Sequence, residues 1–493
     1  MKMYKISSLA MGMLVLSSTA YADLKNDKIT LKPNMTIQYN TKQKSVDSLN
    51  QMFSEGEFYA RLRMNTFKWD WSQDTAGTNN KALGLGGSFI YKSAKLSGLS
   101  TTFGLYTSQN PSFLRMQEDE VGSVKAGKDT FSRYDTGATG EFGMSVLGQA
   151  YLQYDISKTS IKIGRQLFES VFTKSNDTKM IPNTFDGVSA TIKDIPDSII
   201  QLGYFTDQKL RDHTSSHDVL AVSVDDNTTS IREDWNGNDD SGVNKSLTTD
   251  LIGNDNKLII ATLTNKSIKN LKANVSVAII PDVLTNATLE AHYRINVGGD
   301  LVVAPGFRYM QQIDNLDSAT NVASLKGSSS VDGYDDPTSL DSSLIAIRLD
   351  IKDKAFLFRL GYSAIEDAAD IIAPWRGFPT AGFTRAMAQY NWYANTKTYM
   401  ARVGYNFDKA GIIKGFNIFA RYAIQDFDDS KDAVQADSSI LHLDAMQNIG
   451  KNLQAKVRIG LVSADDDIVK ENLGGTKTDV SYNEYRFELN YFF

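Results

Sequence analysis

The chain has 493 residues, with 52 Lys and Arg against 58 Asp and Glu, no Cys, and a hydrophobic fraction of 41%. This composition is too apolar for a disordered chain, and the lack of Cys excludes structural disulfides and Cys-based metal or redox sites. Beyond the first two dozen residues, no window holds the ~18 consecutive apolar residues of a membrane-spanning helix. A multidomain β protein and one large β-barrel remain as candidates.

Residues 1–22 have the three parts of a secretory signal peptide. A short n-region with Lys2 and Lys5 precedes a mostly apolar stretch, and Ala20-Tyr21-Ala22 forms a small-x-small cleavage site before Asp23. We therefore expect cleavage near Ala22-Asp23 and export to the cell envelope. A large exported chain without Cys fits the outer membrane of a Gram-negative bacterium better than a small disulfide-rich secreted fold.

Residues 23–56 form an N-terminal extension whose pattern assigns no structure. From residue 57 to residue 493, segments of about ten residues alternate between apolar and polar side chains, which is typical of a transmembrane β-barrel. The alternation predicts eighteen strands, an even number, as in bacterial single-chain barrels. They run over 57–69, 82–93, 98–108, 145–156, 159–166, 186–194, 197–210, 256–264, 270–281, 286–297, 300–312, 341–352, 354–366, 397–407, 416–426, 439–447, 453–463 and 482–493. The predicted fold class is all-β, with one antiparallel transmembrane barrel over residues 57–493.

The connections between these segments alternate in length. Short ones carry turn residues, at Ser157-Lys158, Pro196-Asp197, Gly298-Gly299-Asp300 and Asp353. Long and mostly polar ones cover 70–81, 109–144, 167–185, 211–255, 313–340, 367–396 and 464–481. Short periplasmic turns and long extracellular loops are the arrangement of outer-membrane barrels, in which the connection 282–285 is short for an outer loop.

The last predicted strand shows the alternation most clearly. One face carries Tyr485, Phe487, Leu489, Tyr491 and Phe493, and the other carries Glu484, Arg486, Glu488 and Asn490. An apolar face toward lipid and a polar face toward a wet lumen are typical of a porin barrel. This end resembles the C-terminal signature that the barrel assembly machinery reads, and Tyr491 and Phe493 are its expected recognition residues.

Arginine placement is the most informative feature for function. The chain has 17 Arg, and ten of them lie in predicted strands, always on the polar face: Arg61, Arg63, Arg294, Arg308, Arg348, Arg359, Arg402, Arg421, Arg458 and Arg486. An arginine that faces lipid near the midplane costs about 2–4 kcal/mol, so this parity predicts a cationic lumen. Glu290, Asp350, Glu484 and Glu488 share the lumen face. The arginines therefore either guide anions or pair with these acids.

Two other motifs are weak candidates for metal sites. Asp212-His213-Thr214-Ser215-Ser216-His217 spaces two His residues by four, but no Glu follows His213 as in zinc proteases, which favours a polar rim. The run from Asp234 to Asp240 alternates oxygen ligands without the closing Glu of a calcium loop, which favours a solvated loop. No Gly-x-Ser-x-Gly nucleophile motif is present. We expect no enzyme activity, no cofactor, no metal and no nucleic-acid partner.

Two stretches of the sequence resemble the OprD family of outer-membrane porins. The first comprises Gly164-Arg165-Gln166-Leu167-Phe168 and the loop 175–188, which reads Asn-Asp-x-Lys followed by Pro-x-x-Phe-x-Gly. The second comprises Ala373-Pro374-Trp375-Arg376-Gly377-Phe378-Pro379 and Ala394-Asn395-Thr396-Lys397. Residues 23–56 have no counterpart in the resemblance.

The resemblance implies an eighteen-stranded monomer whose third and seventh loops fold inward and narrow the pore. It implies that these loops supply the constriction, with Arg165, Asn176, Asp177, Lys179, Pro182, Trp375 and Arg376 as the matching residues. It also implies a ladder of basic lumen residues that guides substrates with a carboxylate.

The favoured function is an outer-membrane porin for passive diffusion of small hydrophilic solutes, such as organic acids or amino acids, along the lumen arginines. The alternative is a structural or adhesive barrel whose long loops 109–144 and 211–255 bind a surface partner. The arginines favour the channel, because an adhesin does not need a cationic lumen. The expected partners are these solutes, outer-membrane lipid and the assembly machinery, with the chain a monomer rather than a trimer.

Overall fold

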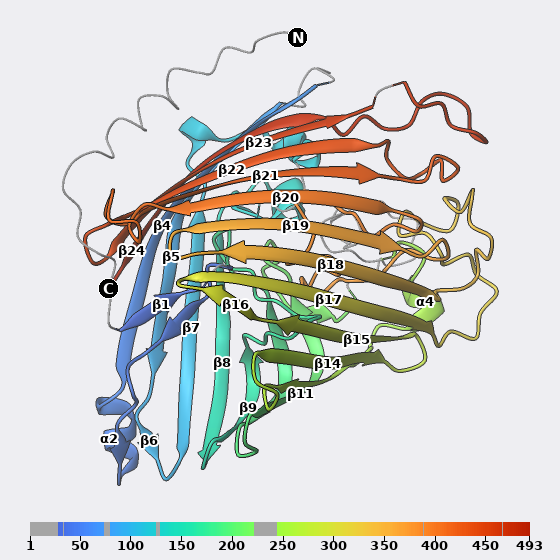
Figure 1. Ribbon diagram of the computed structural model, residues 1–493. Coiled ribbons are helices and arrows are strands. Elements are labelled where there is room, and N and C mark those ends of the chain that lie inside the picture. Colours follow the sequence, from blue (N-terminus) through green and yellow to red (C-terminus); the bar gives the residue numbers. More distant parts are fainter. Residues whose placement is uncertain are drawn as a thin grey trace.

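Period-two alternation produces strands in the computed structural model wherever the sequence predicts them (Figure 1). The structure describes residues 28–32, 34–72, 79–124, 129–220, 244–387, 389–465 and 467–493. The barrel strands are β4 (Glu57–Trp71), β5 (Asn80–Lys92), β7 (Leu99–Gln109), β8 (Met144–Ile156), β9 (Thr159–Gln166), β10 (Thr184–Ile192), β11 (Ser198–Lys209), β13 (Leu258–Asn265), β14 (Leu271–Ile280), β15 (Leu284–Tyr293), β17 (Leu301–Asp314), β18 (Ser342–Lys352), β19 (Phe356–Ile365), β20 (Lys397–Asn406), β21 (Phe416–Asp426), β22 (Ser438–Ile449), β23 (Leu453–Ala464) and β24 (Tyr482–Phe492). Short strands are β1 (Ile29–Leu31), β2 (Ile37–Tyr39), β3 (Ser45–Val46), β6 (Lys95–Leu96), β12 (His217–Asp218) and β16 (Ile295–Gly298). The short helices are α2 (Leu49–Ser54), η2 (Ser112–Leu114), η3 (Glu118–Ser123), α3 (Arg133–Thr139) and α4 (Thr249–Ile252).

The long strands pair in chain order and close into one barrel, because β24 pairs with β4 in antiparallel register, with Asn490 opposite Arg63. The prediction of an eighteen-stranded antiparallel barrel is confirmed. The predicted strand 286–297 is interrupted at Arg294, which lies between β15 and β16. Among the described residues, no helix has the length and apolar character needed to cross a membrane.

Side chains alternate between the two faces of the wall. In β4, Arg61 and Arg63 are buried inside, whereas Leu62 between them is 57% exposed on the outer surface. Phe89 in β5 and Leu105 in β7 are likewise exposed on the outside. Such an apolar outer band is stable against lipid but not against water.

Long and short connections lie at opposite ends of the barrel (Figure 1). The long connections include loop 2 (110–143), loop 3 (167–183), loop 4 (210–257), loop 6 (315–341) and loop 7 (366–396). The connection between β14 and β15 is short, as predicted. The loop-bearing end is the extracellular end by the general rule for outer-membrane barrels.

The long loops fold back over and into the extracellular half of the barrel. Leu247 of loop 4, Val322 of loop 6 and Trp375 of loop 7 belong to one buried apolar cluster together with Phe168 of loop 3 and Leu344 of the wall. Burial of apolar surface therefore holds the loops together at this end. These loops therefore pack against the wall in the extracellular half of the barrel interior.

The C-terminal aromatic residues lie on the outer face at the periplasmic end. Phe493 is 53% exposed, its ring lies 4.8 Å from that of Tyr491, and its backbone N–H donates to the Ala60 carbonyl at 2.9 Å. This position leaves both rings accessible to a partner before the strand meets lipid.

Deletion of Phe493 should lower the amount of barrel in the outer membrane, because the exposed terminal ring and its hydrogen bond to β4 are lost together. Synthesis and export should stay unchanged. Quantitative gels of the heat-modifiable form, with Phe493→Tyr as the control that keeps an aromatic terminus, would measure this. Equal yields of wild type and deletion variant would contradict the assembly role.

Candidate functional site

The inner wall carries a lateral row of charged side chains at one level of the barrel. The strand register places Asp350 of β18 opposite Arg359 of β19, Arg359 opposite Arg402 of β20, and Arg402 opposite Arg421 of β21. His442 of β22 stands next in the row. Because residues directly opposite on one face are close neighbours, the sequence places three guanidinium groups side by side here.

Most of the predicted lumen arginines have carboxylate partners. Arg458 binds Asp444 through two hydrogen bonds of 2.6 and 2.7 Å, and Arg486 binds Glu484 at 3.0 Å. Arg359 likewise binds Asp350 with both nitrogens of its fork. The remaining pairs are Arg308 with Glu290, Arg61 with Asp177, and Arg63 with both Asp177 and Glu488. Four of these arginines pair with acids that the sequence places on the lumen face: Arg63, Arg308, Arg359 and Arg486. Arg61 and Arg458 pair instead with Asp177 and Asp444.

Arg402 and Arg421 differ from these six arginines. Within the part of the chain that the structure describes, neither has a carboxylate within ion-pair distance. Their guanidinium groups lie 4.2 and 5.7 Å from the ring centroid of Phe419, and the Nε atom of each is buried without a hydrogen-bond partner. Arg348 is intermediate, with its Nε 3.9 Å from Asp350.

Loop 3 is attached to the wall mainly through Asp177. One carboxylate oxygen accepts from Arg61 Nη2, and the other accepts from Arg63 Nη1 at 2.7 Å. The side chains of Arg61 and Arg63 are both 0% exposed. They are therefore covered by loop 3 and do not line the open pore, contrary to their predicted place in the arginine track.

Further contacts fix the rest of loop 3 against β4 and β11. Asn65 donates from Nδ2 to the Lys179 carbonyl at 3.3 Å, and the Lys179 ammonium lies 4.5 Å from the Phe67 ring centroid. The Pro182 carbonyl accepts from the Lys209 ammonium at 3.3 Å. Lys179 and Pro182, two residues that the resemblance assigns to the third loop, thus lie inside the barrel and hold loop 3 against the wall.

Loop 7 is joined directly to loop 3. Thr173 and Arg376 form an antiparallel bridge, and Asn176 donates from Nδ2 to the Arg376 carbonyl at 3.1 Å. The Gly377 N–H donates to the Phe172 carbonyl at 2.8 Å. The Trp375 indole is fully buried and donates to the loop 4 carbonyl of Val219 at 2.8 Å. The two loops named by the sequence resemblance are therefore joined to each other inside the barrel.

Wall arginines also hold the second half of loop 7. Its carbonyl groups accept hydrogen bonds from four of them: Pro379 from Arg308, Gly382 from Arg348 and Arg359, and Arg385 from Arg421. Arginine suits this role because its planar fork can bind a carboxylate and a carbonyl at the same time. Sequence reasoning missed this use, because the accepting groups are backbone carbonyls and have no side-chain signature.

Loop 7 also has a buried carboxyl group that joins it to loop 6. Asp370 accepts hydrogen bonds from the N–H groups of Leu325 and Ala394, both at 2.8 Å, and from the Tyr334 hydroxyl at 2.7 Å. Burial raises the pKa of Asp370 to about 6, so its charge changes just below neutral pH.

Arg165 lies outside loops 3 and 7, in which the resemblance places the constriction. Arg165 lies in β9 and shares its face with Ile161 and Ile163, which are exposed on the outer surface. It pairs there with Asp186, directly opposite on β10. Arg294 is exposed at the break between β15 and β16. Strand parity already places Arg165 outside, whereas the resemblance suggested the pore.

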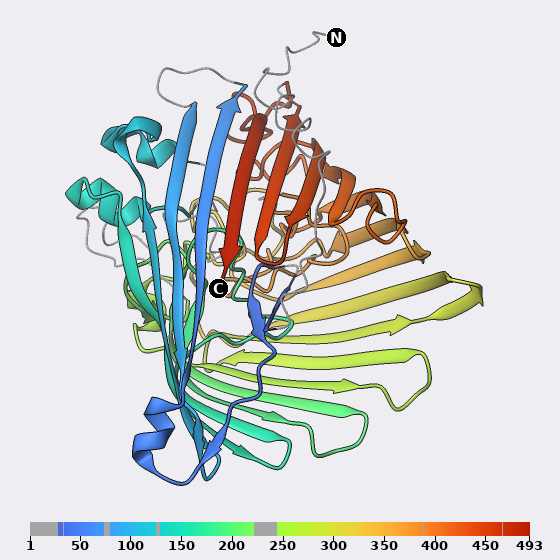
Figure 2. The same cartoon turned by 90° about the vertical axis from the view of Figure 1, so that its left-hand side faces the viewer.

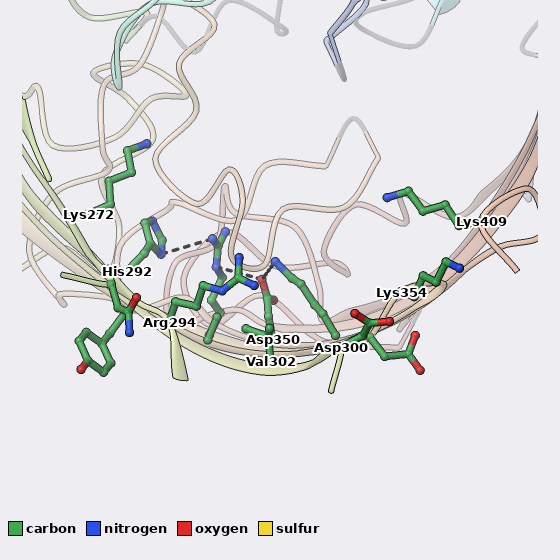
Figure 3. Close-up of a pocket in the computed structure, with 14 residues that line it drawn as sticks. Lys272, His292, Arg294, Asp300, Val302, Asp350, Lys354 and Lys409 are labelled. Atoms are coloured by element: carbon green, nitrogen blue, oxygen red, sulfur yellow. Dashed lines mark hydrogen bonds and ion pairs between the residues drawn. The ribbon is translucent and has the colours of Figure 1, made fainter. Parts of the chain in front are cut away.

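A pocket near the periplasmic turns carries a basic lining (Figure 3). Figure 3 shows Lys272, His292 and Asp350 on the concave inner face, with Lys409 pointing toward them from the opposite side. Its basic residues are Lys272, Arg294, Arg348, Lys352, Lys354 and Lys409, and its acids are Asp300, Asp350 and Asp353. The charged row is therefore continuous with a cationic region on the periplasmic side.

The other sequence candidates do not converge on a metal site. His213 and His217 stack edge-on with ring centroids 4.6 Å apart, and burial lowers the pKa of His213 well below its usual range. His213 is buried, whereas His217 is partly exposed. In the described ranges, no group of three or more His, Asp or Glu residues is arranged to hold a metal ion. The acidic run 234–240 lies outside the described residues.

Residues 125–433 match the model of a family described as "outer membrane porin, OprD family". The structure is similar to Acinetobacter baumannii OccAB3 (TM-score 0.67, 16% identity, covering 89% of this chain and 99% of that chain) and to Pseudomonas aeruginosa OccK9, also named OpdG (0.65, 15%, 90% and 99%). It is also similar to Pseudomonas aeruginosa OpdK in its crystal structure with vanillate (0.65, 12%, 90% and 99%). At these identities the likeness shows a common fold. No curated protein matches the chain.

Proposed function

Because the chain belongs to the OprD family of outer-membrane porins, we propose that its channel passes small hydrophilic solutes that carry a carboxylate. One observation carries this proposal: Arg402 and Arg421 are direct neighbours on the inner wall and have no carboxylate partner among the described residues. Two adjacent cations without an internal counter-ion attract an anion from outside the protein.

The magnitude of this attraction depends on the narrow setting. A carboxylate about 4 Å from one guanidinium gains about 4 kcal/mol at an effective dielectric constant of about 20, against about 1 kcal/mol in bulk water. The Phe419 ring beside both cations adds an apolar surface that excludes water from one side. The loops and the wall thus convert two weak surface charges into a selective anion site.

The cationic periplasmic pocket extends the proposed path. Asp350 lies both at the end of the charged row and in the lining of that pocket, and Arg348 lines the pocket beside it. An anion that leaves Arg402 and Arg421 therefore meets further positive charge before it reaches the periplasm. The whole path is built from one chain, so the proposal needs no second copy.

Two further considerations support a channel over an adhesive barrel. OpdK, a structural neighbour, has been crystallised with vanillate, which is a carboxylate. The described parts of loops 2 and 4 also bind other parts of this chain, as Arg211 does with Asp129 at 2.7 Å and Thr214 with Asp135 at 2.9 Å. Those parts are occupied by internal contacts, which leaves less of them for a surface partner.

The double substitution Arg402→Gln with Arg421→Gln should shift the reversal potential toward cations in a planar bilayer and lower the uptake of carboxylate solutes. Both effects should be larger at low salt, because the Debye length falls from about 30 Å at 0.01 M to about 3 Å at 1 M. The matched control is Arg402→Lys with Arg421→Lys, which keeps both charges and should retain anion preference.

The outcomes separate the proposal from a purely structural role of these arginines. Loss of anion preference in the Gln variant, with retention in the Lys variant, would support it. Wild-type selectivity of the Gln variant at low salt would show that the unpaired arginines do not guide the solute.

A further inference from the structure

The N-terminal extension places a β-hairpin inside the barrel. Strands β1 and β2 pair in antiparallel register from Ile29 opposite Tyr39 to Leu31 opposite Ile37. Figure 2 looks at the end of the barrel with the short turns and shows this dark-blue segment across the opening. Ile29 belongs to a buried cluster with inward-facing residues of the wall, including Tyr59 of β4 and Ile90 of β5.

Residues 41–56 anchor this hairpin at the periplasmic rim. Strand β3 pairs in parallel with β6 of the first periplasmic turn, with Val46 opposite Leu96. The Ala94 N–H donates to the Met52 carbonyl of α2 at 2.9 Å, and Val46, Met52 and Ala94 form a small buried cluster. The chain thus passes under the turn before β4 begins, which directs the upstream hairpin into the lumen.

The hairpin touches the wall through specific contacts. The Met35 carbonyl accepts from Arg61 Nη1 at 2.9 Å, so one arginine holds both the hairpin and loop 3. The Tyr39 ring lies 4.0 Å from that of Tyr59, and the Lys92 ammonium lies 4.4 Å from the Tyr39 ring centroid. These contacts order the hairpin against one side of the barrel.

The tip of the hairpin also touches loop 3. The Glu169 carboxylate accepts from Asn34 Nδ2 at 2.6 Å and from Thr36 Oγ1 at 3.2 Å. Tyr59 and Arg61 stand near the periplasmic start of β4, whereas Asn65, which binds loop 3, stands closer to the outer end. The hairpin therefore extends the constriction from loop 3 toward the periplasm.

The space around the hairpin stays open on one side. A pocket is lined by Lys32 and Gln38 of the hairpin and by Lys92, Tyr151 and Lys162 of the wall. The hairpin contacts β4, β5 and loop 3. Arg402 and Arg421 lie on other strands, β20 and β21. The hairpin thus fills the part of the lumen away from the unpaired arginines.

We propose that the hairpin formed by residues 28–32 and 34–40 is a third constriction element, which narrows the periplasmic half of the pore and confines solutes to the arginine-bearing side. It determines specificity by size, since it removes cross-section without adding a charge of its own to the row. The proposal rests on the channel function of the family and does not depend on the preference for carboxylates.

Deletion of residues 28–40, with the anchor 41–56 intact, should raise single-channel conductance and admit larger neutral sugars in liposome swelling. Heat-modifiable migration on gels should persist, because the barrel strands are untouched. A milder variant, Glu169→Ala, removes the acceptor for the tip and should increase current noise. Glu169→Gln keeps an oxygen that accepts the same hydrogen bonds and should behave as wild type.

The absence of Cys allows a second test that does not depend on folding of the deletion variant. A negatively charged thiosulfonate reagent should reduce the conductance of a Gln38→Cys channel in a single step, since Gln38 is exposed in the lumen pocket. The control is Ile268→Cys, 60% exposed in a periplasmic turn, whose modification should leave conductance unchanged.

Two results would overturn the proposal: equal conductance of wild type and the assembled deletion variant, or modification of Gln38→Cys without a change in current. Both readouts are independent of ion selectivity. If the hairpin deletion leaves conductance unchanged while the Arg402 and Arg421 substitutions abolish anion preference, this inference alone is refuted. If the deletion raises conductance while those substitutions leave anion preference unchanged, the arginine proposal alone is refuted.

Discussion

Replacement of Asp177 by Asn should strongly destabilise the protein. Arg61, Arg63, Asp177 and Glu488 form a closed group of two cations and two anions with almost no exposed surface. Removal of one anion leaves an uncompensated buried cation, which typically costs about 3–5 kcal/mol. The temperature at which the barrel loses its fast gel migration should fall markedly.

The same substitution should also release loop 3 from the wall. Among the described residues, Asp177 is the loop 3 carboxylate that binds the arginines of β4, so its loss should make the single-channel current larger and noisier. The control is Asp282→Asn, an exposed acid in the short connection between β14 and β15. This substitution also removes one negative charge, but from a side chain that water solvates.

A charge-balancing variant tests the physical cause. In the Asp177→Asn background, Arg61→Gln restores neutrality and leaves Arg63 paired with Glu488 at 2.7 Å. Recovery of part of the lost thermal stability is expected. If Asp177→Asn unfolds at the wild-type temperature, the buried group does not contribute as described.

Gly377→Val should separate loops 3 and 7. A β-carbon at residue 377 would lie 2.0 Å from the Phe172 carbonyl carbon and 2.1 Å from its oxygen, which are backbone atoms and have little freedom to move. The clash also breaks the hydrogen bond from the Gly377 N–H to Phe172. Steric overlap of this kind typically costs about 1–3 kcal/mol, and more where backbone must shift.

The functional result of Gly377→Val should be a change in conductance together with weaker discrimination among solutes, because loop 7 leaves its place beside loop 3. Planar-bilayer recordings and liposome swelling would measure both. The matched control is Gly404→Ala on the inner wall, where an added β-carbon meets neighbours at 3.7–3.8 Å, an ordinary contact distance. Unchanged conductance of Gly377→Val would mean that the loop junction does not shape the pore.

The lumen arginines thus have two physical roles. Arg308, Arg348 and Arg359 bind acids and loop 7 carbonyls, and so they hold the constriction in place. Arg402 has neither type of partner among the described residues, and Arg421 binds only the Arg385 carbonyl. Guidance of anions is therefore proposed for a small part of the set that the sequence presents as one ladder.

The sequence by itself determined the barrel. Alternation with period two follows directly from strand geometry, and lipid on one side with a polar lumen on the other makes that alternation strict over every strand. The strand number, the ends of the strands within a few residues and the inward parity of Arg402 or Arg421 therefore follow from local pattern alone. The resemblance of two loop motifs, in the third and seventh loops, to the OprD family led to the expectation that these loops narrow the pore.

Only the tertiary structure decided which charges pair and where the N-terminal extension lies. Asp177 and Arg61 are more than a hundred residues apart, and the acceptors in loop 7 are backbone carbonyls that every residue possesses. The hairpin formed by residues 28–32 and 34–40 enters the lumen because residues 41–56 pass beneath the first turn. Such contacts depend on barrel closure and loop packing, which join distant segments without a local sequence pattern.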